Sequence, residues 1–451
     1  MRIAVIGTGY VGLVTATCLA HIGHDVVCVD TQSARVAAVN EGKPVFYEPG
    51  LAEMLASVLR EGRLRATGAT AEAVASSDMT FLAVGTPCRD GEIDLSYLSS
   101  AAAEVGRGLR GAAGYKVVVV KSTVVPGTTD TLVRTILERT CGRPAGHFGL
   151  AMNPEFLREG SAVADFMEPD RIIIGQWDDA SGRKLAEVYG AFDCLKVFTT
   201  LRNAEMTKYA SNALLATLVS FSNEFAGLCE ATPGTDVEEV LHGLQLDRRL
   251  SPLHAGERVT PGILAYLRAG CGFGGSCLPK DVSALRHFAH TQGVASPLLD
   301  AVSAVNAARP AQLVAMAEDT VGSLCGTTIA VLGLAFKPGT DDLRDSPALA
   351  VIAELKRKGA EIRSYDPLVT SLADVHVCGS VQEAITGTDA AIIVTAWPEF
   401  VNLDWSALAL LMRHPVLIDG RNALRGVATP KSVTRVAIGK NFEKVGVARA
   451  H

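Results

Sequence analysis

A glycine pattern near the N-terminus constrains the fold more than any other feature of the sequence. Ile3–Ile6 is a short apolar run that predicts a buried strand, and it passes directly into Gly7-Thr-Gly9-Tyr-Val-Gly12. In this order the first glycine makes a tight turn, the second lets a pyrophosphate approach the backbone, and the third lets a helix pack closely on the strand. The helical pattern Leu13–His21 follows, and a helix N-terminus offers free N–H groups to phosphate. The opening therefore predicts a βαβ unit that binds a dinucleotide.

An acidic residue at the end of the next predicted strand, Asp25–Val29, supports this interpretation. Asp30 stands where a carboxylate accepts the ribose hydroxyls of NAD, and an acid there favours NAD over NADP. Arg35 is either a second ribose or phosphate contact or a solvated helix residue. The alternative is a turn in an α/β domain that binds nothing, but strand, glycine spacing and acid occur together here.

The rest of the first part of the chain repeats this alternation of strand and helix. Short Val/Ile-rich runs are separated by amphipathic stretches, which is typical of a parallel sheet built from βαβ units. The expected strands are Arg2–Ile6, Asp25–Val29, Met79–Val84 and Lys116–Lys121, with Phe148–Met152 and Arg171–Gly175 as extensions of the sheet.

The second half of the chain begins with a long helix and returns to an α/β pattern. Apolar residues recur every three or four positions over Asn203–Glu230, with Asn203 as the expected N-cap, and the turn-rich stretch Asp247–Gly275 follows. Short buried strands are then expected at Thr328–Leu332, Glu361–Ser364, Ala391–Thr395 and Val416–Ile418, with a helix at Ala348–Lys358. The predicted fold class is α/β, with two doubly wound Rossmann-like domains joined by a long central helix. The expected domains are residues 1–202, which bind NAD, residues 203–310, which are helical, and residues 311–451, which form the second α/β domain.

Composition excludes several classes of function. The formal net charge of −6 over 451 residues gives no basic surface for nucleic acid or an anionic membrane. No apolar stretch is long enough to span a bilayer, and Ile3–Ile6 is too short for a signal peptide, so we expect a cytoplasmic protein. The ten cysteines show neither a C-x-x-C pair nor a Cys/His cluster at zinc spacing, and no metal site is predicted.

Two acids follow the predicted strand that ends at Met152. Glu155 and Glu159 lie in Asn153-Pro-Glu-Phe-Leu-Arg-Glu-Gly160, at the carboxyl end of a sheet where open α/β folds bind ligands. Their spacing of four places both carboxylates on one side of a helical turn, where neighbouring carboxylates suit general-base work. The alternative is a pair of exposed acids at the start of a helix.

Lys208 and Asn212 are four residues apart on the predicted long helix, with Glu205 one turn before Lys208. A lysine and an asparagine that project together into a cleft can hold an oxyanion as it develops on a reacting carbon. The alternative is a solvated polar stripe.

The strongest candidate for a nucleophile is Cys277, in Gly272-Phe-Gly-Gly-Ser-Cys-Leu-Pro-Lys-Asp281. The glycines let the backbone approach a ligand closely, and Pro279 suits the first position of a helix. A helix N-terminus and the nearby Lys280 both favour a reactive thiolate, although a cysteine chosen at random is more often structural. An NAD site beside a nucleophilic cysteine indicates aldehyde oxidation through a thiohemiacetal and a thioester.

At this point the chain resembles the nucleotide-sugar dehydrogenases, and most closely the UDP-glucose 6-dehydrogenases. The resemblance covers almost the whole length and rests on many separate motifs in one order. These are Gly7–Gly12, Tyr47–Leu51, Val84–Pro87, Lys121–Thr123, Asn153–Gly160, Pro169–Ile172, Ala204–Lys208 with Asn212, Gly272–Asp281, Gly333–Pro338 and Asp419–Arg421.

The resemblance implies a four-electron oxidation that uses two NAD⁺ in succession. A first hydride leaves the sugar's hydroxymethyl carbon, the cysteine captures the aldehyde, a second hydride transfer gives the thioester, and water cleaves it. The expected reaction is UDP-glucose to UDP-glucuronate, for polysaccharide or related biosynthesis. The same chemistry on dTDP-glucose, GDP-mannose or an N-acetylated sugar stays open. The resemblance also implies that residues 203–310 dimerise through the central helix, giving a homodimer, and that residues 311–451 bind the nucleotide sugar.

Position by position, the resemblance implies a set of site residues. Cys277 is the nucleophile, Lys208 and Asn212 hold the oxygen of the reacting carbon, Asp281 and Thr123 position a water, and Glu155 is the base in thioester hydrolysis. The cofactor-side residues are Gly7, Gly9, Tyr10, Val11, Gly12, Asp30, Arg35, Thr86, Thr123, Glu159, Lys280 and Arg344. The substrate-side residues are Glu155, Phe156, Leu157, Lys208, Asn212, Arg249, Tyr266, Leu267, Gly270, Gly274, Lys337 and Arg421.

The chain departs from the family pattern near Arg249, which resembles an arginine that reaches the neighbouring subunit's substrate. Leu250-Ser251 replaces the usual Ile-Gly, and an insertion precedes Gly272, so Arg258 is a rival for that role. Two other classes of function also stay open. One is a two-electron hydroxy-acid dehydrogenase, which needs no cysteine, and the other is a non-catalytic NAD-binding regulator.

Overall fold

The computed structural model describes residues 1–89 and 91–441, which form two compact units. The first contains Met1–Ser211 and Ser283–Gly293, and the second contains Asn212–Val282 and the described part of Val294–His451. The long helix α9 (Leu201–Ala231) and the helix α11 (Leu278–Thr291) both run from one unit into the other. The predicted domain limits at 202/203 and 310/311 fall inside α9 and α12 (Pro297–Val321), and they stay predictions.

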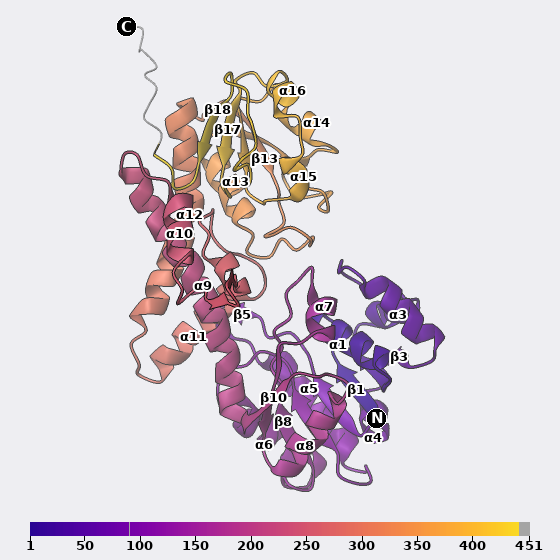
Figure 1. Cartoon of the computed structure of the whole chain (residues 1–451). Helices are drawn as coiled ribbons and strands as arrows, with labels where there is room; N and C mark the ends of the chain where they lie inside the picture. The colour runs from indigo at the N-terminus through magenta and orange to yellow at the C-terminus, as the bar shows by residue number, and fades with distance from the viewer. Residues whose placement is uncertain (90, 442–451) are drawn as a thin grey trace. The chain divides into compact units, whose positions relative to one another are not determined.

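The first unit is built on an eight-stranded sheet, shown in indigo to magenta in Figure 1. Its order is β10 (Leu195–Thr200), β9 (Arg171–Gln176), β8 (Gly149–Met152), β7 (Val117–Val120), β4 (Met79–Leu82), β1 (Arg2–Ile6), β2 (Asp25–Val29) and β3 (Leu64–Thr67). β1 lies between β2 and β4, so the chain reverses its direction of winding there, and this is the place where open α/β sheets bind ligands.

The expectation of an entirely parallel sheet was wrong at one edge. β8 and β9 do extend the sheet as expected, but they pair antiparallel, and β10 continues parallel to β9. The segment between β8 and β9 contains only the short helix α7 (Ala162–Met167), so the chain returns without a full crossover helix.

Alternate residues of the strands pack into two separate cores, one on each face of the sheet. On β1, Ile3 and Val5 belong to one cluster, and Ala4 and Ile6 belong to the other. A strand that is apolar on both faces must be covered on both, as the doubly wound fold requires. The helices of this unit are α1 (Tyr10–His21), α2 (Ser33–Asn40), α3 (Leu51–Arg60), α4 (Thr70–Ser76), α5 (Ser96–Leu109), the π-helix η1 (Thr128–Val133), α6 (Arg134–Cys141), α7 and α8 (Asp179–Val188), and a short hairpin pairs β5 (Cys88–Arg89) with β6 (Glu92–Ile93).

Helix α9 begins two residues before the expected N-cap. The side chain that accepts a helix N–H is that of Thr200, whose Oγ1 accepts the N–H of Asn203 at 3.2 Å, so Asn203 lies inside the first turn. A threonine at this position provides the same kind of acceptor as asparagine, and the apolar repeat alone does not distinguish the two. The prediction of Asn203 as the cap was therefore wrong.

The second unit contains a six-stranded parallel sheet. Its order is β15 (His376–Val377), β14 (Glu361–Tyr365), β13 (Thr328–Leu332), β16 (Ala390–Ile393), β17 (Val416–Asp419) and β18 (Thr434–Ala437), with β13 between β14 and β16 at a second reversal of winding. The helices α13 (Pro347–Arg357), α14 (Val381–Ile385), α15 (Pro398–Val401) and α16 (Trp405–Ala409) accompany it (Figure 1). The prediction of two doubly wound domains and a long central helix is confirmed.

The part of the chain that follows β10 and precedes β13 is helical, with one short hairpin. α10 (Val237–Gln245) follows α9, and the turn-rich stretch contains the hairpin of β11 (Leu253–His254) and β12 (Glu257–Arg258) and the 3₁₀ helix η2 (Gly262–Tyr266). Among the helices that the structure describes, none combines the length and the apolar character needed to cross a membrane.

Candidate active site

The glycine turn after β1 has the geometry that the pattern predicts. Gly7 has a φ of +100°, and a Cβ added there would lie 2.7 Å from the carbonyl oxygen of Ala83. A Cβ on Gly12 would lie 1.9 Å from the carbonyl oxygen of Gly7, so only glycine lets α1 pack this closely. At Gly9 a Cβ would meet no atom within 4 Å. Two glycines are thus required by packing, and the middle one borders open space.

The turn places the start of α1 beside that open space. Gly9 is the N-cap, and Tyr10 and Val11 form the first turn, whose N–H groups have no acceptor within the helix. These groups and the positive end of the helix dipole suit a pyrophosphate. The residues of the turn therefore fit the predicted dinucleotide.

Asp30 follows β2 and is buried with its charge intact. Its Oδ2 accepts the N–H of Thr8 at 3.0 Å and the hydroxyl of Thr8 at 2.6 Å, and its Oδ1 accepts the N–H of Gln32 at 2.9 Å. Burial alone would raise the pKa of Asp30, but these bonds and Arg35, whose Nη1 lies 3.7 Å from Oδ2, hold the pKa below its ordinary value. Asp30 is therefore an ionised acceptor suited to ribose hydroxyls, and Arg35 pairs with it.

The loops after β4 and β7 are joined by a threonine pair. The hydroxyl of the buried Thr86 donates to the carbonyl oxygen of Thr123 at 2.8 Å. Both residues were predicted on the cofactor side, and each follows a strand of the same sheet edge.

The segment after β8 is not helical, so the predicted shared turn of Glu155 and Glu159 was wrong. Residues 153–158 have no regular secondary structure, and the carboxylate of Glu155 pairs with Lys208 at 3.0 Å between Oε1 and Nζ. Both side chains are almost completely buried, as is that of Glu159. Pro154 interrupts the helical pattern that the spacing suggested.

The ion pair keeps Glu155 ionised in spite of its burial. Desolvation alone would raise the pKa of Glu155, but the charge and hydrogen bond of Lys208, the N–H of Leu157 and the charge of Lys121 together lower it. The Nζ of Lys208 also lies 5.5 Å from the ring centre of Phe156, which offers its electron-rich face to the cation. The alternative of a solvated polar stripe on α9 is excluded, because Lys208 is only 3% exposed and Asn212 only 7%.

Lys121 is a buried cation in the motif Lys121–Thr123 that was not predicted as a site residue. Its Nζ donates to Oδ1 of Asn153 at 2.9 Å, and the same oxygen accepts the hydroxyl of Tyr189 at 2.6 Å. Burial lowers the pKa of Lys121 to about 8. Its place at the end of a fully apolar strand was the available signal, because lysine is rarely buried without a specific partner.

Glu48 was also missed, although it lies in the quoted motif Tyr47–Leu51. Its carboxylate accepts the N–H groups of Gly160 and Ala162, each at 2.7 Å, and the hydroxyl of Tyr10. This acid therefore connects the first turn of α1 to the segment that carries Glu159 and Gly160. Burial and Glu48 both raise the pKa of the Tyr10 hydroxyl, which remains a proton donor.

In the second unit, Cys277 directly precedes α11, as predicted, and the N–H of Asp281 donates to its carbonyl oxygen at 2.9 Å. Pro279 is the second helical residue and not the first, because the helix already begins at Leu278. Asp281 is 1% exposed and accepts Nδ2 of Asn212 at 2.6 Å and Nζ of Lys280 at 2.5 Å. The structure thus brings three predicted site residues together one turn after the cysteine.

The glycine loop before Cys277 packs against the terminal domain with no room for a side chain. A Cβ on Gly274 would lie 2.2 Å from the carbonyl oxygen of Asp345, and one on Gly275 would lie 2.7 Å from the ring of Phe336. The N–H of Gly275 donates to the carbonyl oxygen of Arg344 at 2.9 Å. The Arg344 side chain itself pairs with Asp342 and is 61% exposed.

Further predicted substrate residues of this unit come from the stretch before Cys277 and from the loops after β13 and β17. Gly270 donates its N–H to Oδ1 of Asn223 at 2.8 Å, and its carbonyl oxygen accepts Nε of Arg309 at 3.1 Å. A Cβ added to Gly270 would lie 2.9 Å from Nη1 of Arg421, so the glycine leaves room for that arginine. Arg421 is held by a hydrogen bond from its Nε to the carbonyl oxygen of Val394 at 2.8 Å. Leu267 is buried, Tyr266 is half-buried, and Nζ of Lys337 lies 5.6 Å from the ring centre of Phe336.

The two rival arginines differ in their surroundings. Arg258 folds back on its own loop, donating from Nη1 to the carbonyl oxygens of Leu246 at 2.7 Å and Ser251 at 2.9 Å. Arg249 is 89% exposed and pairs with Asp247. Arg249 is thus the arginine that can turn away from its partner at a small cost in free energy, because an exposed ion pair contributes little to stability.

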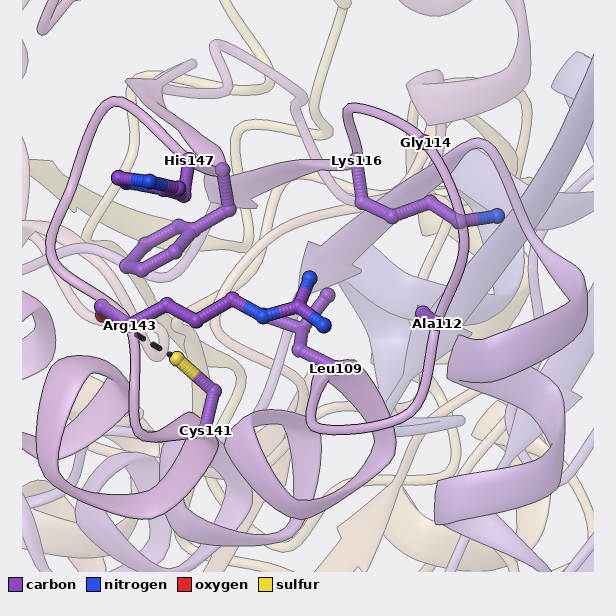
Figure 2. Close-up of a pocket in the computed structure, with 8 residues that line it drawn as sticks. Leu109, Ala112, Gly114, Lys116, Cys141, Arg143 and His147 are labelled. Carbon is purple, nitrogen blue, oxygen red and sulfur yellow. Dashed lines mark hydrogen bonds between the residues drawn. The ribbon is translucent and has the colours of Figure 1, made fainter.

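Two of the hollows in the described part of the chain are each lined by residues of one unit. The one in Figure 2, lined by Lys116, Cys141, Arg143 and His147 among others, has about 10 Å³ of free volume, enough for one water. The other has a free volume of about 340 Å³ in the second unit. Its lining residues are Glu238, Leu241, His242, Gln245, Leu267, Arg268 and Arg425.

Models of a single enzyme family match successive parts of the chain. The NAD binding domain of the UDP-glucose/GDP-mannose dehydrogenase family matches residues 1–193, its central domain matches 202–308, and its UDP binding domain matches 330–426. The chain belongs to this family. It is therefore an NAD-dependent nucleotide-sugar dehydrogenase, which confirms the resemblance seen in the motifs.

Individual relatives cover nearly the whole chain. The UDP-glucose 6-dehydrogenase TuaD of Bacillus subtilis is 41% identical over 429 residues, which are 93% of this chain and 89% of that protein. The UDP-glucose 6-dehydrogenase of Rhizobium meliloti is 43% identical over 442 residues, 94% and 96% of the two chains. The solved UDP-glucose dehydrogenase of Pyrobaculum islandicum is 40% identical with a TM-score of 0.86 and covers 96% and 98% of the two chains.

The glycine turn can be tested by placing alanine at each of two positions. Gly9→Ala adds a methyl group that meets no protein atom, so we expect a melting temperature near that of the wild type and NAD affinity reduced by about tenfold or more. Gly12→Ala forces α1 away from the turn and should lower both. Calorimetric NAD titration and thermal melting measure the two effects, with Gly111→Ala, which also meets no atom, as the control. NAD affinity unchanged by Gly9→Ala would show that the pyrophosphate binds elsewhere.

The buried ion pair predicts a pH-dependent cost for losing the lysine. Lys208→Met removes the cation that pairs with the buried Glu155 carboxylate and leaves Lys121 as the cation near it. We therefore expect the unfolding free energy to fall by about 3–5 kcal/mol at pH 7. The loss should shrink at pH 5, because protonation then relieves the uncompensated charge. Urea unfolding at both pH values measures this, and Glu155→Gln in the Lys208→Met background should restore much of the stability. Equal losses at both pH values would contradict the prediction.

Proposed function

We propose that this enzyme oxidises UDP-glucose to UDP-glucuronate in two successive oxidations through a thioester on Cys277. The observation that carries the proposal is the position of Cys277 at the start of α11, one turn before the buried Asp281 that bonds Asn212 and Lys280. The preference for UDP-glucose is supported by the match to a UDP binding domain and by the several UDP-glucose 6-dehydrogenases among the relatives. A GDP-mannose 6-dehydrogenase from Azotobacter vinelandii is 41% identical over a shorter stretch of 376 residues, so GDP-mannose is the substrate to compare.

The first oxidation removes a hydride and a proton from the hydroxymethyl group. NAD, when bound at the glycine turn, accepts the hydride in each oxidation. Lys208 is a buried cation, and with Asn212 it stabilises the oxygen as negative charge develops. Asp281 is buried and accepts hydrogen bonds from Asn212 and Lys280, so it orients a water that receives the alcohol proton, a role in which we also place Thr123.

The cysteine then makes the second oxidation possible. The Cys277 sulfur adds to the aldehyde carbon, and the resulting thiohemiacetal loses a hydride to become a thioester. Glu155 is ionised and removes a proton from the water that attacks the thioester, so that the carboxylate forms and the thiol is released. Overall the alcohol loses four electrons and gains one oxygen from water.

Several exposed apolar residues on α9 support a homodimer through the central helix. Leu214, Phe221 and Leu228 recur every seven residues and are 51%, 40% and 57% exposed. A seven-residue apolar repeat on an exposed helix face is the pattern of helices that pack against one another. All ten cysteines are free, in keeping with a reducing compartment, and we place the enzyme in the cytoplasm.

The stoichiometry of NADH tests the chemistry. With limiting UDP-glucose we expect two NADH per sugar, and with Cys277→Ser we expect no UDP-glucuronate, because the second oxidation lacks its thiohemiacetal. Absorbance and mass spectrometry of the product measure both, and Cys325→Ser, an exposed thiol, is the matched control. One NADH per sugar in the wild type would indicate a two-electron dehydrogenase. NAD binding without turnover of UDP-glucose, dTDP-glucose or GDP-mannose would favour a regulator.

The dimer can be tested by charging its proposed seam. Phe221→Glu combined with Leu228→Glu should give monomers, because two carboxylates would be buried without partners. Light scattering after size exclusion measures the mass. Leu410→Glu, at a residue 86% exposed, provides the control, and a dimer that survives the double substitution would locate the interface elsewhere.

A further inference from the structure

An edge strand of the second sheet places a histidine and a cysteine on the same face. His376 pairs with Arg363 of β14, and the N–H of Cys378 donates to the carbonyl oxygen of Ser364 at 2.7 Å, so the strand geometry continues through Cys378. Residues two apart on a strand point to the same side, which brings the imidazole and the thiol together.

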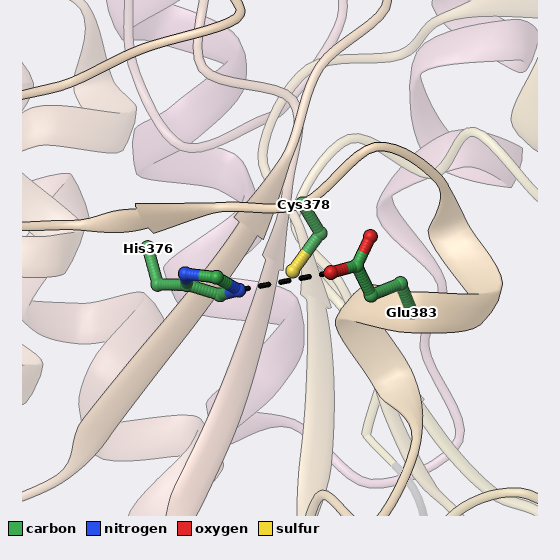
Figure 3. A group of neighbouring side chains, drawn as sticks. All are labelled: His376, Cys378 and Glu383. Carbon is green, nitrogen blue, oxygen red and sulfur yellow. Dashed lines mark ion pairs between the residues drawn. The ribbon is translucent and has the colours of Figure 1, made fainter.

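The turn after this strand adds a carboxylate. Ser380 caps α14 by accepting the N–H of Glu383 at 3.2 Å, and Oε2 of Glu383 accepts the N–H of Gly379 at 2.8 Å. These two bonds direct Oε1 toward Nε2 of His376, at 3.8 Å. Figure 3 shows the imidazole, the thiol and the carboxylate turned toward one another, and one potential ligand atom from each lies within 4.8 Å of the others.

The three donors match a borderline-soft cation in type, and their spacing is close to the spacing that such an ion requires. Zinc binds thiolate at about 2.3 Å, imidazole at about 2.0 Å and carboxylate oxygen at about 2.0–2.2 Å in a tetrahedron, which separates the donor atoms by roughly 3.3–3.8 Å. The side chains of His376 and Glu383 are exposed and can rotate to bring their donor atoms closer. Cys378 is buried, and its backbone is fixed by the hydrogen bond to Ser364. A hard cation such as Mg²⁺ would not select a sulfur and a nitrogen ligand.

An exposed ion pair between His376 and Glu383 is the simpler explanation of part of this geometry. This ion pair accounts for the imidazole and the carboxylate, but it does not account for the thiol of Cys378 beside them. The cation Arg363 on β14 disfavours a metal ion, although its Nη1 is directed to the carbonyl oxygen of Thr386 at 2.7 Å.

We propose that His376, Cys378 and Glu383 form a binding site for one Zn²⁺ ion, with water in the fourth position. The thiol proton passes to solvent as the sulfur–zinc bond forms, and no electrons are transferred. The bound ion connects the edge strand β15 to α14, two elements joined only by the short segment 378–380. The site lies outside the residues assigned to catalysis and does not depend on the proposed reaction.

The test is a Zn²⁺ titration in competition with a coloured chelator. It uses the full-length protein with Cys277→Ser, so that the nucleophile cannot act as a ligand. We expect one ion per chain, and adding Cys378→Ser or His376→Asn should weaken its binding by about tenfold or more. Cys325→Ser provides the matched control, since this exposed thiol has no part in the cluster.

A spectroscopic measurement identifies the ligands independently of affinity. Co²⁺ bound at the site should give a sulfur-to-cobalt charge-transfer band in the Cys277→Ser protein and none after Cys378→Ser. Zn²⁺, but not Mg²⁺, should also raise the melting temperature in the first protein and not in the second. No bound ion at equimolar Zn²⁺, or binding and spectra unchanged by Cys378→Ser, would overturn the proposal.

Discussion

The buried ion pair between Glu155 and Lys208 is the interaction on which the first half of the site depends. It joins the segment that leaves β8 to helix α9, two parts of the chain that are far apart in sequence. Each charge would be costly to bury alone, and each is acceptable because the other lies 3.0 Å away. Lys121 adds a second cation near the same carboxylate, so these three side chains carry a net positive charge when both lysines are protonated. Such an environment favours an anion more than a neutral molecule, which suits the developing alkoxide of the proposed first oxidation.

Two further buried acids hold neighbouring loops in place by accepting backbone N–H groups. Glu48 holds two N–H groups of the segment after Glu159, and Glu205 accepts the N–H groups of Gly127 and Thr129 at the start of η1. Burial raises the pKa of Glu205 to about 7, although those hydrogen bonds oppose the shift. On helix α9, Glu205 therefore holds the loop at the start of η1, and Lys208, one turn later, pairs with Glu155.

The sequence was sufficient for the features that arise from local pattern. Spacing and periodicity, which a short segment contains in full, predict five such features. These are the glycine turn, the acid after β2, the strands of both sheets, the long helix and the cysteine at the start of a helix. What it could not provide depends on contacts between distant segments. The direction of β9, the partner of Glu155 and the burial of Lys121 are set by which loops meet after folding, and an i, i+4 spacing cannot distinguish a helical turn from an extended loop that contains proline. The cap is Thr200 and not Asn203. Both side chains carry an oxygen that can accept a helix N–H, so the sequence alone did not distinguish them.

The close packing of Gly274 and Gly275 against Asp345 and Phe336 limits how this enzyme can diverge. The loop that leads to Cys277 and the loop that follows β13 fit without space for one methyl group, so neither can change shape alone. Exchange of terminal domains between relatives that use different nucleotides would therefore succeed only when both loops come from the same parent. Recombination points for such chimaeras should fall outside both loops, and natural variation at these two loops should be correlated.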